Sequence, residues 1–254
     1  MTARWCTVVP MTIEYLIPVL LGGLAGGFVV GLAGFGNGIV ALGIWLFALS
    51  PTVAATLVAV CSVVAQLQNL PKIWHTIEPR RVIPFILPGL VGVPIGTVLL
   101  ASVDVRTFKL MIGSILLFYA LHSLIHRSNA GTSWGGRVAD GAIGFGGGIL
   151  GGLAGLSGPL PTIWADIRGW TKVQSRSVFQ VFNLTILGSV VVSHAFAGFV
   201  TKELGFAAMI ALPATMVGSW IGFAVYGRLS DWRFKQAILA LLLVSGLAHI
   251  LTNI

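Results

Sequence analysis

A glycine-rich break occurs twice in this chain, and each copy interrupts an apolar run long enough to enter a lipid bilayer. The first copy is Gly31–Gly38, Gly-Leu-Ala-Gly-Phe-Gly-Asn-Gly, and the second, 121 residues later, is Gly152–Pro159, Gly-Leu-Ala-Gly-Leu-Ser-Gly-Pro. Backbone that leaves a helix at membrane depth has unpaired polar groups, which are costly unless they line a cavity or are buried in protein. Paired breaks at corresponding positions of two halves therefore predict a transporter with a site near the membrane midplane.

The composition supports a membrane-embedded chain. Of the 254 residues, 56% are hydrophobic and only 9% are charged, whereas soluble domains carry about 25% charged residues. Apolar runs cover almost the whole length, so we expect a single transmembrane domain over residues 1–254. The net charge of +8 does not indicate nucleic-acid binding, because the basic residues stand at the ends of apolar runs. Met11 directly precedes the first run, so the true start stays open between Met1 and Met11.

Charges and prolines divide the chain into apolar segments. Two of these, 35–49 and 156–167, directly follow the glycine-rich breaks and fall short of the roughly 17 to 25 residues of a spanning helix. We expect each to form, with the segment before it, a re-entrant or broken helical hairpin that turns near Gly34–Asn37 or Gly155–Pro159. The segments are 14–33, 35–49, 52–70, 82–101, 107–126, 137–155, 156–167, 172–200, 203–226 and 232–253.

The basic residues fall unequally on the two sides of the membrane in this topology. Cytoplasmic loops carry an excess of Lys and Arg, so the side with eleven is predicted to be cytoplasmic and the side with four to be outside. Both termini are then predicted to lie on the periplasmic or extracellular side. The chain itself is predicted to be embedded in the cell inner (plasma) membrane. The richer side holds Lys72, Arg80, Arg81, Arg127, Arg137, Arg168, Lys172, Arg176, Arg228, Arg233 and Lys235, and the poorer side holds Arg4, Arg106, Lys109 and Lys202.

Each half then has one hairpin and three spanning helices, an odd number of crossings, so the second half is inverted relative to the first. The segment Val91–Lys109 also matches Val217–Lys235 at several positions, with a constant spacing of 126. We expect an all-α polytopic membrane protein of roughly 8 to 10 membrane helices, built as two inverted repeats. Repeat 1 covers about 12–126, a linker covers 127–136, and repeat 2 covers about 137–253.

Two glycine pairs one helical turn apart, Gly92 with Gly96 and Gly218 with Gly222, predict close packing of helices. The sequence does not decide whether they pack within one chain or between two copies, so a homodimer stays open.

The hairpin tips are the candidate anion site. At each tip we expect unpaired backbone N–H groups and a helix start whose dipole end is positive, which suits an anion. The candidates are Gly36, Asn37 and Gly38 at the first tip and Ser157 and Gly158 at the second. Asn37 and Ser157 supply side-chain donors, whereas the glycines serve the turn or the approach of a ligand, and the sequence does not separate these roles.

Polar residues in the apolar segment 172–200 extend the candidate site. Gln180 and Asn183 lie three residues apart and so on one helix face, where they contact substrate or bond a neighbouring helix. Arg176, one turn earlier, either guides an anion inward or is an ordinary cytoplasmic-side charge. His194 is the natural candidate for proton coupling, the alternative being a bond to a carbonyl or an outward orientation. The polar group at 66–69 is interpreted as interfacial.

No enzyme signature stands out, since the chain lacks His-Glu-x-x-His, Gly-x-Ser-x-Gly and the nucleotide-binding Gly-x-x-x-x-Gly-Lys-Ser/Thr motif. All seven acidic residues lie at segment ends or in loops. We therefore expect neither catalysis, nor a metal site, nor a cofactor.

The two glycine-rich motifs resemble those of the TauE/SafE family of anion permeases, often called sulfite exporters. Pro51–Thr56 and the Gly-Val-Pro-Ile-Gly segment at 92–96, with its second copy, extend the resemblance over about 12–253. The resemblance implies export of sulfite, or of a small organosulfonate such as sulfoacetate, across the inner membrane by alternating access. A passive small-anion channel, or a carrier of another small anion such as a carboxylate, is the alternative. Because Ser157 and Gly158 replace Gly36 and Asn37, we expect the two tips to be chemically unequal.

Overall fold

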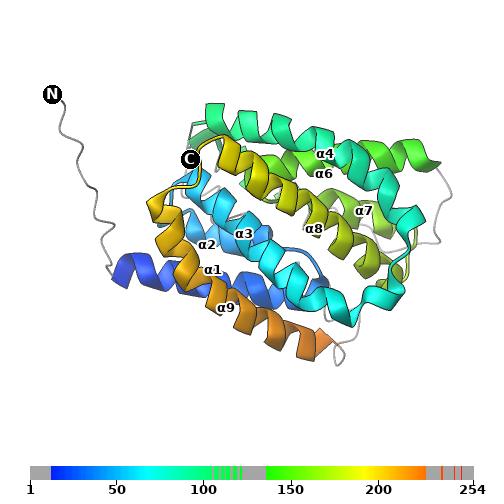
Figure 1. Cartoon of the computed structure of the whole chain (residues 1–254), viewed down its shortest axis with the longest axis horizontal. Coiled ribbons are helices and arrows are strands. Elements are labelled where there is room, and N and C mark those ends of the chain that lie inside the picture. The colour runs from blue at the N-terminus through cyan, green and yellow to red at the C-terminus, as the bar shows by residue number, and fades with distance from the viewer. Residues whose placement is uncertain are drawn as a thin grey trace.

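The computed structural model describes residues 13–104 and 136–226, several residues between 106 and 121, and residues 236, 243 and 247. These residues are almost all helical and include no strand, which confirms the all-α prediction. The elements (Figure 1) are α1 Ile13–Ala33, α2 Asn37–Trp45, α3 Pro51–Asn69, η1 Leu70–Lys72, η2 Trp74–Thr76, α4 Pro79–Ser102, α6 Gly136–Ala154, α7 Pro159–Ile167, α8 Lys172–Phe196 and α9 Lys202–Tyr226.

The helix boundaries follow the predicted segments, with two informative differences. Helix α4 begins at Pro79, three residues before the predicted segment, because proline fits the first turn of a helix and the following arginines continue it. Helix α8 ends at Phe196 rather than at 200, because Gly198 adopts a left-handed φ of 78° and closes the helix end. The predicted segments 107–126 and 232–253 and the linker 127–136 lie largely outside the described residues.

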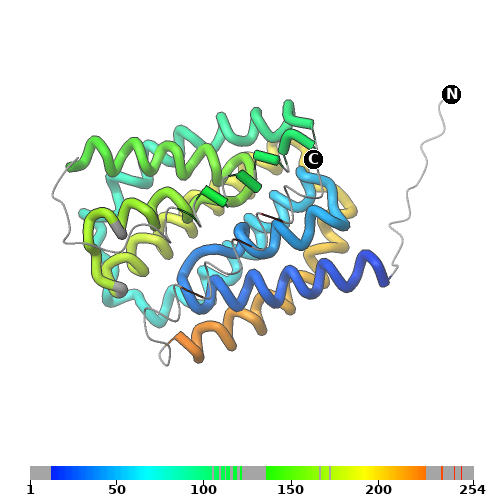
Figure 2. The backbone as a smooth tube through the Cα atoms, turned by 180° about the vertical axis from the view of Figure 1, so that it is seen from behind, coloured from blue at the N-terminus to red at the C-terminus, as the bar shows by residue number. Residues whose placement is uncertain are grey.

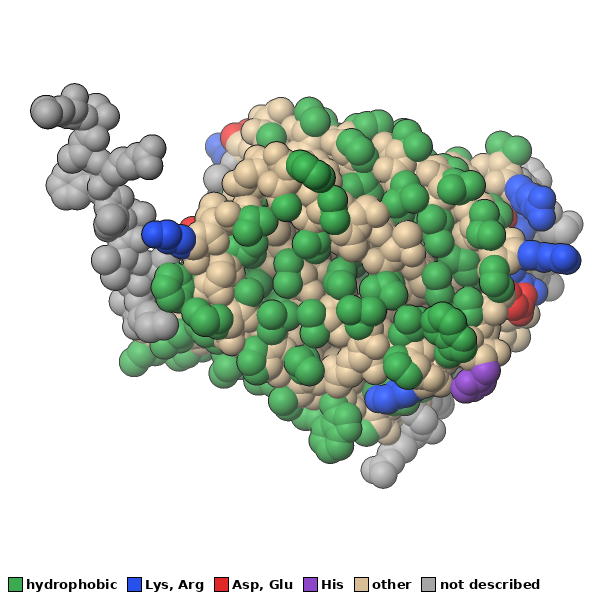
Figure 3. Space-filling view, viewed as in Figure 1, with side chains coloured by type: hydrophobic (Ala, Val, Ile, Leu, Met, Phe, Trp, Pro, Cys, Tyr) green, Lys and Arg blue, Asp and Glu red, His purple; other side chains and the backbone are tan. Residues whose placement is uncertain are grey.

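Within the part of the chain that the structure describes, five helices are long and apolar enough to cross a membrane, namely those within Ile13–Ala33, Pro51–Lys72, Pro79–Ser102, Val173–Phe196 and Lys202–Tyr226. On the face seen in Figure 3, charged side chains gather toward the two ends of the molecule, and a broad band between them is almost free of charge. Apolar side chains that would be costly to expose to water are exposed in large number along α4 and α9. The protein is therefore a multi-pass membrane protein.

The two glycine-rich breaks end α1 and α6. Gly34 and Gly36 have φ values of 79° and 97°, and Gly155 has 69°, which is left-handed backbone that glycine adopts without strain. Each break is followed by a helix of nine residues, α2 or α7, about 14 Å long and too short to cross a bilayer. Figure 2 shows α2 turning back beside α1. The predicted chain reversals at Gly34–Asn37 and Gly155–Pro159 are thus present.

Glycines bring two pairs of helices into very close contact. A methyl group on Gly27 of α1 would clash with the Thr215 carbonyl of α9, and one on Gly148 of α6 would clash with the Gly89 carbonyl of α4. The predicted glycine pairs belong to these contacts: Gly92 faces the backbone of α6, and Gly218 faces the backbone of α1. Their close packing therefore occurs within one chain.

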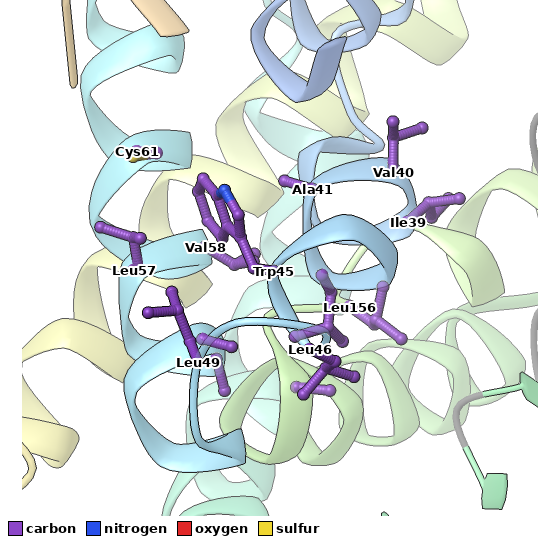
Figure 4. Packing of buried hydrophobic residues seen from close by; sticks show 14 of the residues in the cluster. Ile39, Val40, Ala41, Trp45, Leu46, Leu49, Leu57, Val58, Cys61 and Leu156 are labelled. Atoms are coloured by element: carbon purple, nitrogen blue, oxygen red, sulfur yellow. The ribbon is translucent and has the colours of Figure 1, made fainter. Parts of the chain in front are cut away.

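Helices α3 and α8 pack against each other between the α1–α9 pair and the α4–α6 pair (Figure 1). The short helices α2 and α7 fill the interior beside them. Figure 4 shows Leu156, from the second break, next to apolar side chains such as Ile39 of α2, Leu46 just after α2 and Val58 of α3. The core therefore extends across the junction of the two breaks, and the candidate site lies inside it.

Candidate functional site

A cavity lies where the two hairpin tips meet. Its free volume is about 10 Å³, roughly the room that one water molecule needs, so the two tips pack closely in this conformation. Helices α2 and α7 both begin at its wall and run away from it in opposite directions (Figure 1). The lining residues are Val30, Phe35, Gly36, Asn37, Gly38, Ile39, Ser62, Gln66, Gly155, Leu156, Ser157, Gly158, Pro159, Asn183 and Leu187.

Asn37 lines the cavity, but its side-chain donors are already used. Its Nδ2 donates to the Val58 carbonyl at 3.1 Å and to Ser62 Oγ at 2.9 Å, and so ties the first tip to α3. Its Oδ1 is buried with no partner among the described residues. The expectation that the Asn37 side chain offers donors to an anion is therefore wrong for this conformation. What Asn37 presents is its backbone N–H, which has no acceptor within the first turn of α2.

Ser157 plays the matching part at the second tip. Its Oγ donates to Asn183 Oδ1 at 2.6 Å, and Asn183 Nδ2 makes a long contact of 3.5 Å with the Gly34 carbonyl of the first tip. Ser157 and Asn183 are 1% and 2% exposed. Through Asn183, helix α8 therefore touches both tips at once.

The tips also pack directly on each other. A methyl group on Gly38 would approach the Gly155 carbonyl to 2.7 Å, and one on Gly158 would approach the Phe35 ring to 2.8 Å. Gly36 instead serves the turn, with its φ of 97°. The sequence left open whether these glycines serve the turn or the approach of a ligand. Gly38 and Gly158 have a further role, because their lack of a side chain lets the two breaks pack closely against each other.

Gln180 and Gln66 brace the first tip from the side. Gln180 Nε2 donates to the backbone carbonyl of Gln66 at 3.1 Å, and Gln66 Nε2 donates to the Gly34 carbonyl at 2.8 Å. Gln180 is not among the residues that line the cavity, whereas Gln66 is. Gln66 is only 1% exposed, so its interpretation as interfacial is wrong. The same holds for Asn69, which is buried and donates to Ser219 Oγ at 2.8 Å.

Arg176 is a buried cation against the first tip. It is 4% exposed, and its guanidinium donates to the Gly31 carbonyl at 2.9 Å and the Leu32 carbonyl at 3.1 Å, in the last turn of α1. The guanidinium also lies over the rings of Phe223 and Tyr226. Among the described residues no carboxylate pairs with it. Arg176 is therefore not an ordinary surface charge, and it leaves positive charge close to the tip.

His194 lies away from the cavity, near the end of α8. It is fully buried, with Nδ1 at 2.8 Å from Thr56 Oγ1 and Nε2 at 2.8 Å from the Gly152 carbonyl, and its ring packs edge-on against Phe199. The outward orientation is therefore wrong, and the alternative bond to a carbonyl is present.

The surroundings of the two tips are unequal, as expected from their sequences. A methyl group on Gly34 would face the side chains of Arg176 and Gln180, whereas one on Gly155 would face Val58 and the Ala55 carbonyl. Arg176 and Ala55 are 121 residues apart, the same spacing that separates the two tips. Corresponding positions thus carry a cation beside one tip and a methyl group beside the other.

Ser62 is a polar lining residue that sequence reasoning missed, in addition to Gln66. It is 2% exposed and stands 121 residues before Asn183, the spacing of the glycine-rich motifs. Applying that spacing to every polar residue in the apolar segments would have found it. A single serine in an apolar helix otherwise carries little signal, because it bonds readily within its own helix.

The cavity offers hydrogen bonds and positive dipole ends without a fixed negative charge. None of the residues that line it is Asp or Glu, and nowhere in the described part of the chain do three His, Cys, Asp or Glu side chains come together. Two helix starts at one cavity wall favour a small anion.

Residues 19–248 match the model of a protein family described as sulfite exporter TauE/SafE. No curated protein and no solved structure shows significant similarity to the chain.

Proposed function

The chain belongs to the sulfite exporter TauE/SafE family, and we propose that it exports sulfite or a small organosulfonate anion from the cytoplasm by alternating access. The observation that carries the proposal is the meeting of two helix N-termini, at Asn37 and Pro159, at one cavity without carboxylates. Unpaired N–H groups and positive dipole ends bind oxyanions without needing a lysine or arginine in direct contact.

In the proposed site the substrate oxygens accept hydrogen bonds from the tips. At the first tip the backbone of Gly36, Asn37 and Gly38 supplies N–H groups, and at the second tip the backbone of Ser157 and Gly158 does so. The hydroxyl of Ser157 and the amide of Asn183 turn from each other toward the substrate when it binds. Because these donors are neutral, release does not require breaking an ion pair, which suits a carrier.

Arg176 and Gln180 take a different role in this proposal. They stand beside Gly34 rather than in the cavity wall, one and two turns from the start of α8. The positive charge of Arg176 raises the local concentration of anions at the first tip, and Gln180 guides them along the same helix face.

We further propose that the chain is a single domain of two inverted repeats, about 12–126 and 137–253, which rearrange about the cavity. The close pairs support it: the α1–α9 and α4–α6 contacts use glycines 121 residues apart, such as Gly27 and Gly148. Their partners, Thr215 and Gly89, are 126 apart. Helices α1 and α6 also run in opposite directions (Figure 1).

The proposed location is the inner membrane, with the ends of the bundle near Arg80 and Arg168 facing the cytoplasm and both termini outside. The support is the excess of Lys and Arg at that end.

Reconstituted protein tests the proposal. Proteoliposomes loaded with sulfite, sulfoacetate or acetate are diluted into anion-free buffer, and efflux is followed with and without substrate outside. Saturable efflux of sulfite or sulfoacetate that is accelerated by external substrate supports a carrier. Efflux of acetate alone assigns a carboxylate carrier, large unitary currents in planar bilayers assign a channel, and no movement of any anion overturns transport.

A further inference from the structure

His194 is a buried titratable group that the proposed substrate site does not use. It lies eleven residues beyond Asn183 on α8, about 16 Å along the helix axis. Both ring nitrogens have partners at 2.8 Å, from two other helices: Thr56 Oγ1 on α3 and the Gly152 carbonyl on α6. The imidazole therefore joins three helices.

The partners fix which nitrogen carries the hydrogen in the neutral ring. A carbonyl oxygen only accepts, so the bond to Gly152 requires a hydrogen on Nε2. Nδ1 then has a free lone pair, which accepts the hydroxyl hydrogen of Thr56. The neutral form is therefore fully hydrogen-bonded.

The same hydrogen-bond partners also accommodate the doubly protonated His194 ring. Thr56 Oγ1 lies 2.7 Å from the Thr52 carbonyl, one turn earlier on α3, as well as 2.8 Å from the ring. When a proton binds Nδ1, the Thr56 hydroxyl rotates, gives its hydrogen to Thr52 and accepts the new Nδ1–H. Every donor and acceptor stays paired in both states, and no residue has to move beyond one hydroxyl rotation.

The immediate surroundings of His194 are uncharged. The groups that meet it are Thr56 from α3, Gly152 from α6 and Phe199 from the turn before α9, while the neighbouring Ser193 bonds Thr97 of α4 at 2.9 Å. The described charged residues on α4, α6 and the end of α3 lie at the opposite end of these helices: Lys72, Arg80, Arg81, Arg137 and Asp140. Those at the same end of the bundle are Glu14, Asp104, Arg106, Lys202 and Glu203, none of which bonds the ring.

The ring's partners adjoin the second hairpin tip. Gly152 is three residues before Gly155, and Thr56 is two residues before Val58, against which Gly155 packs. Hydrogen bonds from a charged donor are stronger than those from a neutral one. A proton on His194 therefore strengthens the bonds that hold α3, α6 and α8 together around this tip.

We propose that His194 is a proton-binding site that couples proton movement to opening and closing at the second hairpin tip. This inference rests on the proposed transport function and names its coupling ion. The protonated ring holds the second tip closed, and the neutral ring leaves it free to separate from α3.

Flux measurements test the coupling. Proteoliposomes with the full chain are loaded with sulfite and given an imposed pH gradient, and wild type is compared with His194→Gln and with the exposed His75→Gln. We expect the gradient to change sulfite efflux several-fold in wild type and His75→Gln and to have no effect in His194→Gln. Gradient dependence that survives in His194→Gln overturns the proton site and leaves the anion transporter standing. If no variant moves sulfite, the same assay is run with sulfoacetate. If neither anion moves, the proposed function fails, and the titration below decides the proton site alone.

A titration tests the site without any flux. In ¹⁵N-histidine-labelled protein the ring signal missing from His194→Gln is followed by NMR between about pH 5 and about pH 8. We expect it to pass from the Nε2–H form to the doubly protonated form. Thr56→Val removes the acceptor for Nδ1–H and should weaken proton binding about tenfold, a shift of about one pH unit, while Thr56→Ser keeps it. A ring that stays singly protonated throughout, with and without sulfite, overturns the proposal.

Discussion

Ser157 Oγ donates a hydrogen bond of 2.6 Å to Asn183 Oδ1, and this contact resembles the one between Asn37 and Ser62 in the first half. Asn183 corresponds to Ser62 in the repeat spacing of 121, whereas Ser157 lies one residue before the position that corresponds to Asn37. Each pair joins a hairpin tip to the long helix that follows it. The chemical groups are exchanged, however: the first tip carries the amide and its helix the hydroxyl, whereas the second tip carries the hydroxyl and its helix the amide. The cavity therefore has one group of each kind on each side, although its two tips differ in sequence.

Ser157→Ala should weaken both substrate binding and folding. It leaves Asn183 Oδ1 buried without a donor, which costs roughly 1–3 kcal/mol, and it removes a proposed substrate contact. We expect a lower melting temperature in detergent and a several-fold higher KM for sulfite efflux. The control is Ser102→Ala, because Ser102 is exposed and its hydroxyl donates to the Val98 carbonyl of its own helix. An unchanged KM would remove Ser157 from the site.

The sequence was sufficient to predict the backbone breaks that form the site, but not the hydrogen bonds of the side chains around it. A break such as Gly34–Gly36 is visible because glycine and a short apolar segment are local signals, and its repetition at Gly155 gives a spacing. Whether Asn37 has free donors depends instead on Val58 and Ser62, which reach it only through the packing of α2 on α3. The burial of Gln66 was missed for the same reason, since the first tip folds back over the end of α3.

Gly148→Ala in α6 should destabilise the protein more than Gly188→Ala in α8. The added methyl group would clash with the Gly89 backbone of α4, which cannot move aside without separating the two helices. Overpacking of this kind costs about 1–3 kcal/mol. Gly188→Ala is the matched control, because nothing lies within 4 Å of a methyl group there, and alanine favours a helix over glycine by roughly 0.5–1 kcal/mol. In detergent, the melting temperature of Gly148→Ala should be lower than that of wild type, and the melting temperature of Gly188→Ala should equal or exceed it.

Arg176→Gln should reduce transport strongly. It removes both the positive charge beside the first tip and the donors to Gly31 and Leu32. A buried cation that stabilises a helix C-terminus is worth up to about 2 kcal/mol, so the melting temperature should fall as well.

Arg176→Lys separates the two roles of Arg176. Lysine keeps the charge but lacks the planar fork that bonds two carbonyls at once, so we expect it to restore sulfite affinity more than stability. Arg80→Gln, at an exposed site, should change neither. If Arg176→Lys and Arg176→Gln lose affinity equally, the charge is not what serves the substrate.

Cysteine labelling should place His75 and Lys202 on opposite sides of the membrane. His75 lies in η2 before α4, at the end of the bundle that collects most Lys and Arg, and Lys202 begins α9 at the other end. In a background with Cys6→Ser and Cys61→Ala, a membrane-impermeant maleimide should label Lys202→Cys in right-side-out vesicles and His75→Cys only in inverted ones. The opposite labelling pattern would reverse the predicted orientation of the protein in the membrane. Arg176 and the first tip would then face outward, and the charge gathered there would favour uptake of an anion over its export.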